Sequence, residues 1–212
     1  MKTVNRHKAG FTLVEMLVVI GIIAVLSGAG IGAYKGAIAS AQKARATELV
    51  MNVKTALIAV MQKDEAWPRA VAAEGSSGNG EMTDRVGAAL ARRGVLSLTY
   101  KTTTDKSTGE KQYRLTGLDQ CGIVSPWASD VIKSKAASGA VSDSEKVPTG
   151  GTIRDHRLRF SIDDDFDGIV KVNYENSRSV EIRDSAAVWC CGRDGKFGTK
   201  DDVKSWAKGQ ER

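Results

Sequence analysis

A single glutamate near the start of an apolar segment is the feature that most constrains this chain. Between Phe11 and Tyr34, Glu15 is the only charged residue. As an α-helix, this segment would be about 36 Å long, which is enough to cross the hydrocarbon core of a bilayer. An ionised carboxylate at the centre of such a helix costs roughly 2.5–3.5 kcal/mol, and less near the interface. We therefore predict a membrane helix over residues 11–34 whose glutamate has a partner.

The ten residues before this segment form a short basic leader that contains no acidic residue. A cut after Gly10 would create a new α-amino group on Phe11, one helical turn from Glu15. That cation, on the same chain or on a neighbouring copy, would neutralise the carboxylate. Because a leader of this length cannot fold, we expect residues 35–212 to form the soluble domain, in the periplasm if the cell is Gram-negative.

The stretch that begins at Lys8, K-A-G-F-T-L-V-E-M-L-V-V-I-G-I-I-A-V-L, resembles the prepilin signature of type IV pilins and type II secretion pseudopilins. The resemblance implies that a prepilin peptidase cuts between Gly10 and Phe11 and methylates the new N-terminus, and that Glu15 acts in assembly. It also implies an inner-membrane protein with a periplasmic domain that polymerises with its own copies. Minor pseudopilins and an inner-membrane assembly platform would be its further partners.

An ordinary secretory signal peptide is the alternative interpretation of the same segment. It too has a basic leader and an apolar stretch, and residues 27–30 are small enough for a cleavage region. A glutamate inside the apolar stretch is unfavourable for such a peptide, and the helical pattern continues past Gly30.

The helical pattern extends well beyond the apolar segment. An apolar stripe recurs every three to four residues at Leu49, Val53, Leu57 and Val60, which predicts a helix face packed on the soluble domain. Trp67-Pro68 should end this helix. After a Gly/Ser loop over residues 74–80, we expect a second, shorter helix that begins at Thr83 or Asp84.

The last third of the chain predicts β-strands. Apolar residues alternate over 158–162, 170–174 and 180–182, and the first two runs should form a β-hairpin. The polar stretches 101–111 and 134–151 are expected to be loops, and Ser125-Pro126-Trp127-Ala128 a turn. The predicted fold class is α+β: a long N-terminal helix, its first half transmembrane, packed on a C-terminal antiparallel sheet.

Two acidic loops are candidate calcium sites. In the loop of residues 192–206, three carboxylates (Asp194, Asp201, Asp202) and several glycines offer the oxygen ligands that Ca²⁺ prefers. This loop resembles the C-terminal calcium loop of major pseudopilins, with Trp206 in the position of its anchor, although Lys200 stands where another aspartate would align. Asp163, Asp165 and Asp167 before Gly168 have the opening spacing of a calcium loop, but Tyr174 would occupy its twelfth position. We expect the first loop to be the stronger site and the second to be a weaker candidate.

The remaining composition argues against several other functions. The net charge of +6 comes from basic residues scattered among 25 acidic ones, so a solvated surface explains it better than nucleic-acid binding. Cys121, Cys190 and Cys191 allow either a bridge from Cys121 to one of the pair or plain buried thiols. His7 lies in the leader and His156 is isolated, so the sequence supports neither a Ser/His/Asp nor a Cys/His arrangement, and we expect no enzyme activity.

Three functions therefore remain. The first is a major pseudopilin that builds a short periplasmic fibre for protein secretion. The second is a surface type IV pilin for adhesion, motility or DNA uptake. The third is an exported enzyme or binding domain behind an ordinary signal peptide. The calcium-like loop favours the first over the second, whereas a disulfide from Cys121 would favour the second.

Overall fold

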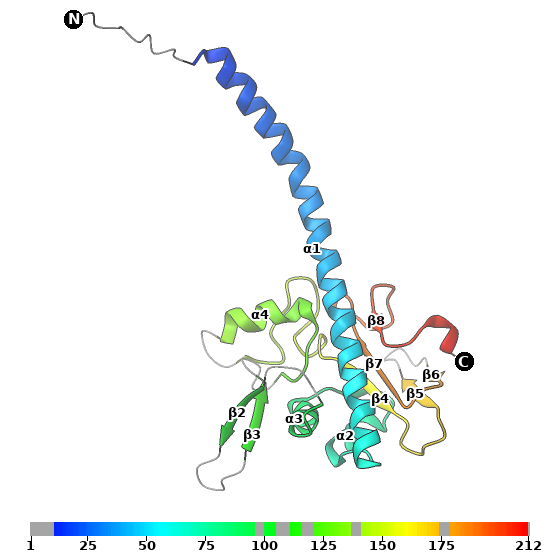
Figure 1. The fold of residues 1–212 in the computed structure, drawn as a ribbon. Coiled ribbons are helices and arrows are strands. Elements are labelled where there is room, and N and C mark those ends of the chain that lie inside the picture. The colour runs from blue at the N-terminus through cyan, green and yellow to red at the C-terminus, as the bar shows by residue number, and fades with distance from the viewer. Residues whose placement is uncertain are drawn as a thin grey trace, which may run out of the picture. The chain divides into compact units, whose positions relative to one another are not determined.

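The computed structural model describes residues 11–95, 100–104, 111–115, 121–136, 141–173 and 179–211. The chain divides into two compact units, Met1–Ala41 and Gln42–Arg212. One helix, α1 (Leu13–Asp64), contributes to both units (Figure 1). The predicted boundary between the apolar segment and the domain, at residues 34 and 35, lies within this helix. Residues 1–10, the predicted leader, lie outside the described residues.

The apolar part of α1 forms the helix that the sequence predicts, and its large side chains between Leu13 and Leu26 are exposed in the isolated chain. Within the residues that the structure describes, however, no helix is both long enough and apolar enough to cross a membrane. The predicted transmembrane span over residues 11–34 is therefore not confirmed. Residues 28–33 of that segment are among those whose side chains are not described.

The core of the second unit lies between α1 and a four-stranded antiparallel sheet. The strand order is β1 (Gly80–Glu81), β4 (Arg159–Ile162), β7 (Ala186–Cys190) and β8 (Val203–Lys204). The predicted apolar stripe of α1 packs here: Val53, Leu57 and Val60 are fully buried with Phe160 and Val188 in one cluster. The stripe and the helix that it indicated are thus confirmed. Helix α1 ends at Asp64, three residues before Trp67.

A two-stranded ribbon contributes to a second apolar cluster. It consists of β5 (Val170–Asn173) and β6 (Ser179–Ile182), paired antiparallel. Alternate residues of β7 belong to different clusters: Val188 and Cys190 to the cluster of α1, and Ala187 and Trp189 to the cluster of the ribbon. Every residue of β7 is buried, as expected of a strand with both faces covered.

The predicted hairpin between the first two strand runs is wrong. Strand β4 pairs with β1 on one side and with β7 on the other, and β5 pairs with β6. All four residues of β4 are buried, which fits a strand inside the sheet with no free edge for β5. The turn that follows β4 therefore carries the chain from the four-stranded sheet to the ribbon. Tyr174, which was expected in β5, lies outside the described residues.

Three elements appear where loops or a turn were expected, and a fourth, α2 (Arg69–Gly75), begins in a stretch without a predicted element and extends into the predicted loop of residues 74–80. Helix α2 directly follows Pro68, and Ser125-Pro126-Trp127-Ala128 leads into helix α4 (Pro126–Ala136) instead of forming an isolated turn. The stretch predicted as a loop over residues 101–111 contains most of β2 (Tyr100–Thr104) and the start of β3 (Lys111–Leu115), which pair with each other. The second predicted helix is confirmed as α3 (Asp84–Arg92), which begins after Thr83. A short 3₁₀ turn, η1 (Lys208–Gln210), follows β8.

A buried group of ion pairs joins β1, β4 and the loop before β4. Glu81 accepts hydrogen bonds from Arg154 at 2.9 Å and from Arg159 at 3.0 Å, and it also pairs with Arg157. The side chains of Arg157 and Arg159 are only 5% and 9% exposed. Two further partners hold Arg157: both oxygens of Asp143 at 2.8 Å and the carbonyl of Cys121 at 2.7 Å. Glu81 is therefore a shared anion for two buried cations.

The three cysteines are free thiols, and each is buried. Of the two alternatives for these cysteines, a bridge from Cys121 or buried thiols, the structure thus shows buried thiols. Burial raises the pKa of Cys121 to about 11 and that of Cys190 to about 12, and it also raises the pKa of Cys191. Their thiolates are therefore disfavoured, which makes these cysteines poor nucleophiles at neutral pH.

Candidate functional site

The N-terminal end of α1 contains a hydrogen-bonded pair formed by Thr12 and Glu15. The backbone N–H and the hydroxyl of Thr12 donate to Oε2 of Glu15 at 2.8 and 2.7 Å. The backbone N–H of Glu15 donates in return to the Thr12 hydroxyl oxygen at 3.2 Å. This is a capping box, in which residues three apart satisfy each other's free groups at a helix start. The Thr-x-x-Glu spacing that indicates such a box is present in the sequence.

The second oxygen of Glu15 is available for another partner. Both hydrogen bonds from Thr12 end on Oε2, and Oε1 has no hydrogen-bond partner within the described part of the chain. The surrounding side chains are apolar and open: Phe11 is 80% exposed and Leu13 81%. The end of α1 therefore combines an anchored carboxylate with a surface that water does not favour. Gly10, the predicted cleavage residue, lies outside the described residues.

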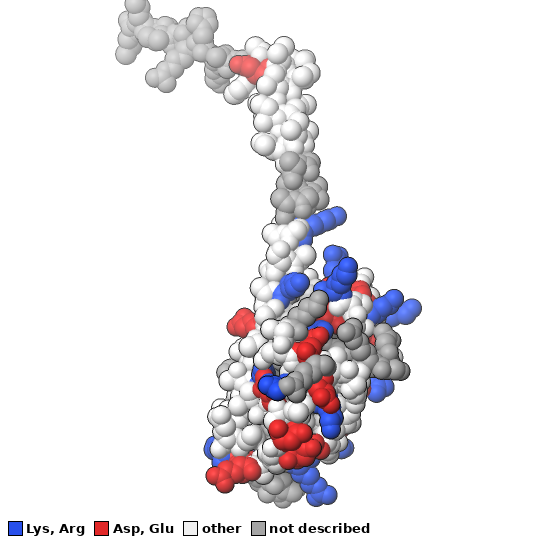
Figure 2. Space-filling model, turned by 90° about the vertical axis from the view of Figure 1, so that its right-hand side faces the viewer, with Lys and Arg blue, Asp and Glu red and all other residues white. Residues whose placement is uncertain are grey.

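The apolar surface continues around the helix from Leu13 to Leu26. Residues on every side are exposed, including Val14, Ile20 and Val25. A helix that is apolar all round is normally buried in lipid or among other helices. In contrast, the face of the molecule in Figure 2 shows Lys and Arg side chains interspersed with Asp and Glu on the second unit, and no single large basic patch.

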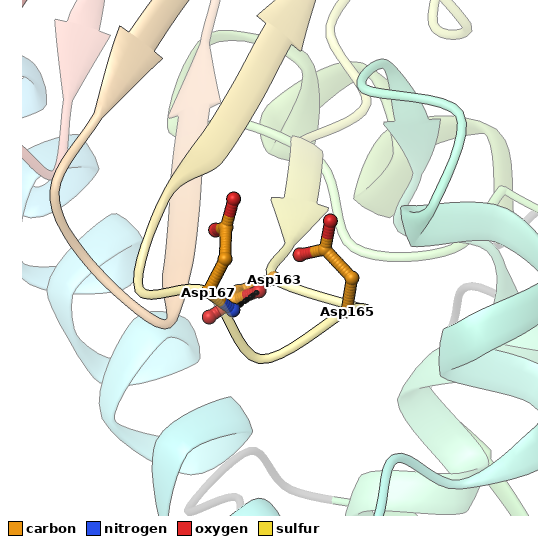
Figure 3. A group of neighbouring side chains, drawn as sticks. All are labelled: Asp163, Asp165 and Asp167. Atoms are coloured by element: carbon orange, nitrogen blue, oxygen red, sulfur yellow. Dashed lines mark hydrogen bonds between the residues drawn. The ribbon is translucent and has the colours of Figure 1, made fainter.

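The turn after β4 brings three predicted carboxylates together. One carboxylate oxygen from each of Asp163, Asp165 and Asp167 lies within 4.8 Å of the others. Figure 3 shows the side chains of Asp165 and Asp167 projecting to the same side of the turn. Asp163 is buried and accepts backbone N–H bonds from Asp167 at 3.2 Å and Gly168 at 2.8 Å. The turn thus combines one buried aspartate, held by two backbone hydrogen bonds, with two exposed aspartates.

The electrostatics of this turn favour a cation. Burial raises the pKa of the Asp163 carboxyl, and the neighbouring carboxylates of Asp165 and Asp167 raise it further, whereas the backbone N–H bonds act in the opposite direction. The net rise means that negative charge is costly at this position. A divalent ion would relieve that cost, because it is the largest local charge at any site it occupies.

The predicted calcium loop of residues 192–206 has a different arrangement. Asp201 accepts hydrogen bonds from the backbone of Arg193 at 2.7 Å and of Asp194 at 3.3 Å, and Asp202 accepts one from Gly198 at 2.7 Å. The Asp194 carboxylate accepts the N–H of Lys196 at 2.9 Å. Among the described residues, the turn after β4 is the group of three acids close enough to hold one ion. The loop carboxylates instead cap backbone groups of their own loop.

One cluster that the sequence did not predict lies in the interior of the second unit. Nδ1 of His156 is 2.9 Å from the Ser125 hydroxyl and 3.3 Å from the Cys191 thiol. These residues are far apart in sequence, so no local pattern could have found the cluster. All three are buried, with 0% exposure. A substrate cannot reach them, so the arrangement resembles a catalytic group in composition but not in access.

The N-terminal residues match a known family. Residues 5–31 match the prokaryotic N-terminal methylation motif. The fimbrial protein EcpC of Eikenella corrodens is 33% identical over 97 residues, which are 44% of this chain and 63% of that protein. The chain thus spans less than two thirds of the length of that relative. No solved structure matches the chain.

Proposed function

We propose that this chain, which belongs to the type IV pilin-like superfamily, is a fibre-forming subunit that polymerises through the N-terminal part of α1. The methylation motif over residues 5–31 and the similarity to a fimbrial protein support this proposal. The observation that carries it is the exposed apolar surface from Leu13 to Leu26 with one carboxylate at its head. The role is structural: before assembly the segment anchors the subunit in the inner membrane, and afterwards it packs among the helices of other copies.

The carboxylate of Glu15 gives this assembly its register. Removal of residues 1–10 by the prepilin peptidase creates a cation on Phe11, and Oε1 of Glu15 is free to accept it in a neighbouring copy. Two unit charges 4 Å apart attract each other by about 4 kcal/mol at an effective dielectric constant of 20. An attraction of this size at one position would favour a single alignment of the helices over all others.

Within the superfamily, we favour a pseudopilin of a type II secretion system, with its domain in the periplasm. Its further partners would be minor pseudopilins and the inner-membrane assembly platform. The resemblance of the loop of residues 192–206 to the calcium loop of major pseudopilins supports this assignment. A surface type IV pilin is the second candidate, and the fimbrial relative supports it. Deleting the gene separates the two: loss of protein secretion without loss of surface fibres supports the pseudopilin, and the reverse supports the pilin.

The substitution Glu15→Leu tests the proposed register. The variant should insert into the membrane as well as the unchanged chain or better, because an apolar residue replaces a costly one. It should nevertheless form few or no fibres, because the Phe11 amine loses its partner. Membrane fractionation measures insertion, and electron microscopy of sheared fibres measures assembly. Thr12→Val is the matched control: it removes a hydroxyl of the capping box but keeps the carboxylate. Assembly of Glu15→Leu at the level of the unchanged chain would contradict the proposal.

We further propose that Ca²⁺ binds the acidic turn of Asp163, Asp165 and Asp167. The closeness of the three carboxylates and the raised pKa of Asp163 support this site. Water and backbone carbonyl groups would complete the six to eight oxygen ligands that Ca²⁺ requires. The loop of Asp194, Asp201 and Asp202, preferred from the sequence, is the second candidate.

Thermal melting of the full chain in detergent, with calcium and with a chelator, tests this proposal. A ligand that binds only the folded state stabilises it by about 2.7 kcal/mol at a hundredfold excess over Kd. For a domain of this size, that corresponds to roughly 5–10 °C in Tm. Asp165→Asn should remove most of the shift, and Asp201→Asn should leave it. A shift lost only in Asp201→Asn would move the site to the C-terminal loop, and no shift in the unchanged chain would exclude both.

A further inference from the structure

His156 is held by partners from three separate segments. Its Nε2 atom lies 2.8 Å from the carbonyl oxygen of Gly150, and its Nδ1 atom faces the Ser125 hydroxyl and the Cys191 thiol. A carbonyl oxygen can only accept, so Nε2 carries the proton and donates to Gly150. Nδ1 then accepts the hydrogen bond of the Ser125 hydroxyl, whereas the single proton of the Cys191 thiol is donated to the Asp155 carbonyl and the sulfur only lies against Nδ1. The site therefore fits one neutral tautomer of the imidazole.

These contacts join three parts of the domain that are far apart in sequence, in addition to the backbone bond that the Ser125 N–H donates to the His156 carbonyl at 2.8 Å. Ser125 precedes α4, Gly150 belongs to the loop of residues 141–157, and Cys191 follows β7. The Cys191 thiol also lies 3.2 Å from the carbonyl of Asp155. Gly150 packs so closely on the next loop that a Cβ there would lie 2.3 Å from the carbonyl oxygen of Asp194. The imidazole thus fixes the loop of residues 141–157 against the end of β7.

The charged neighbours of His156 are few. The carboxylates of Asp155, in its own loop, and of Asp194, in the loop after β7, both favour the imidazolium, and the titratable Cys191 thiol is in direct contact. Burial outweighs them and lowers the pKa of His156 below its ordinary value. A proton on Nδ1 would remove the acceptor of the Ser125 hydroxyl and would point at the Cys191 sulfur, which is a weak acceptor. It would also place a charge at a position with no access to water.

We propose that His156 is a pH-sensitive latch: in mildly acidic solution, a proton taken up at Nδ1 opens the contact between the loop of residues 141–157 and the end of β7 and exposes the Cys191 thiol. The proposal rests on the fold of residues 42–212 and not on the proposed function. It concerns local opening, in which the sheet and the cluster around α1 stay folded.

The direction of the pH effect follows from the lowered pKa. The closed form binds no proton at His156, whereas the open form binds one below about pH 6.5, the ordinary value for histidine. The closed form is therefore fully favoured above that pH, and this preference is lost as the pH falls below it. The carboxyls of Asp163 and Asp202 act in the opposite direction: burial raises their pKa values, so their protonation favours the folded state.

The chain suits a direct test because it contains only two histidines, His7 and His156. In the full chain with His7→Gln, in detergent, ¹⁵N NMR of the imidazole reports the protonation state and tautomer of His156 alone. In parallel, 4,4′-dithiodipyridine, which reacts with thiols in acid, measures the exposure of each cysteine, with the modified residue identified by peptide mass. We expect the neutral Nε2–H tautomer at neutral pH. The rate of Cys191 modification should rise as the pH falls below 6.5, by a factor that approaches ten per pH unit, the limit for one proton.

Two controls separate the latch from general unfolding. Cys190 packs in the cluster of α1, so it should stay protected while Cys191 becomes reactive. His156→Gln keeps a donor for Gly150 and an acceptor for Ser125 but cannot gain a proton, so Cys191 should then react at one rate across this pH range. An imidazolium at His156 with Cys191 still protected would overturn the proposal. Simultaneous exposure of Cys190 and Cys191 would overturn it too, as would an unchanged pH response in His156→Gln. If that variant does not fold, the NMR and thiol data on the histidine-containing chain decide alone.

Discussion

Replacing Glu81 by glutamine is expected to lower the free energy of unfolding by about 3 kcal/mol, the lower end of the usual cost of removing one member of a buried ion pair, because Arg157 keeps Asp143 as a partner. Glu81 is the shared anion of Arg157 and Arg159, whose side chains are 5% and 9% exposed. Glutamine fills nearly the same volume, so the loss reports the charge and not a cavity. Urea denaturation of the full chain in detergent, followed by tryptophan fluorescence, measures the change.

The matched control is Arg154→Gln, which removes a different partner of the same carboxylate. The Arg154 side chain is 63% exposed, so water replaces the lost pair and the cost should stay below about 1 kcal/mol. Equal losses in Arg154→Gln and Glu81→Gln would mean that the buried arginines do not depend on Glu81.

The same network predicts a pH dependence. Burial raises the pKa of the Glu81 carboxyl, but the hydrogen bonds and charges of the three arginines outweigh burial, so this pKa lies below its usual range. The stabilisation from Glu81 is therefore complete above the unfolded-state pKa, near about 4.3. It is lost as the pH falls through the lower folded-state value. Glu81→Gln should remove this part of the acid sensitivity.

Replacing Gly10 by leucine is expected to abolish processing, and with it fibre formation. Glycine presents no side chain to the peptidase, and a branched side chain at the cleavage position should exclude the chain from its active site. The leader would then stay attached, the Phe11 amine would not form, and Glu15 would have no cation to bind. Intact mass and N-terminal sequencing measure the outcome. The unchanged protein should begin at Phe11, and Ala9→Ser should be processed normally. A mature protein that begins elsewhere, or a processed Gly10→Leu variant, would reject the cleavage site.

Local patterns predicted the elements that periodicity defines. The α1 stripe through Val53, Leu57 and Val60 was readable because each residue contacts the sheet at helical spacing. The pairing of β4 with β7 could not be predicted, since an alternating apolar pattern identifies a strand but does not specify which other strand it pairs with. Three elements were missed, the polar strands β2 and β3 and the helix α4. None of them has a clear apolar face in the sequence. Tertiary contacts decide such segments.

Among the candidate sites, too, those formed by residues close together in sequence could be predicted, and features that depend on the folded backbone could not. Glu15 and the three aspartates of the turn after β4 were found from sequence because each set lies within a few residues. The sequence favoured the loop of Asp194, Asp201 and Asp202 over this turn, because the direction of each carboxylate depends on backbone N–H groups that only the folded loop reveals. Asp201 shows this, because its oxygens accept bonds from Arg193 and Asp194.

Helix α1 is fastened to the rest of its domain at widely separated points, and this determines how the domain bears tension. Lys54 is 2.5 Å from a carboxylate oxygen of Asp184, in the turn before β7, and the Trp67 indole, just beyond the end of α1, donates to the carbonyl of Asp163 at 2.7 Å. Between them the buried stripe lies against the sheet. A force applied along the helix axis must therefore shear all of these contacts at once instead of peeling them apart in sequence. A subunit pulled by its helix inside a growing polymer would transmit that force with its domain intact.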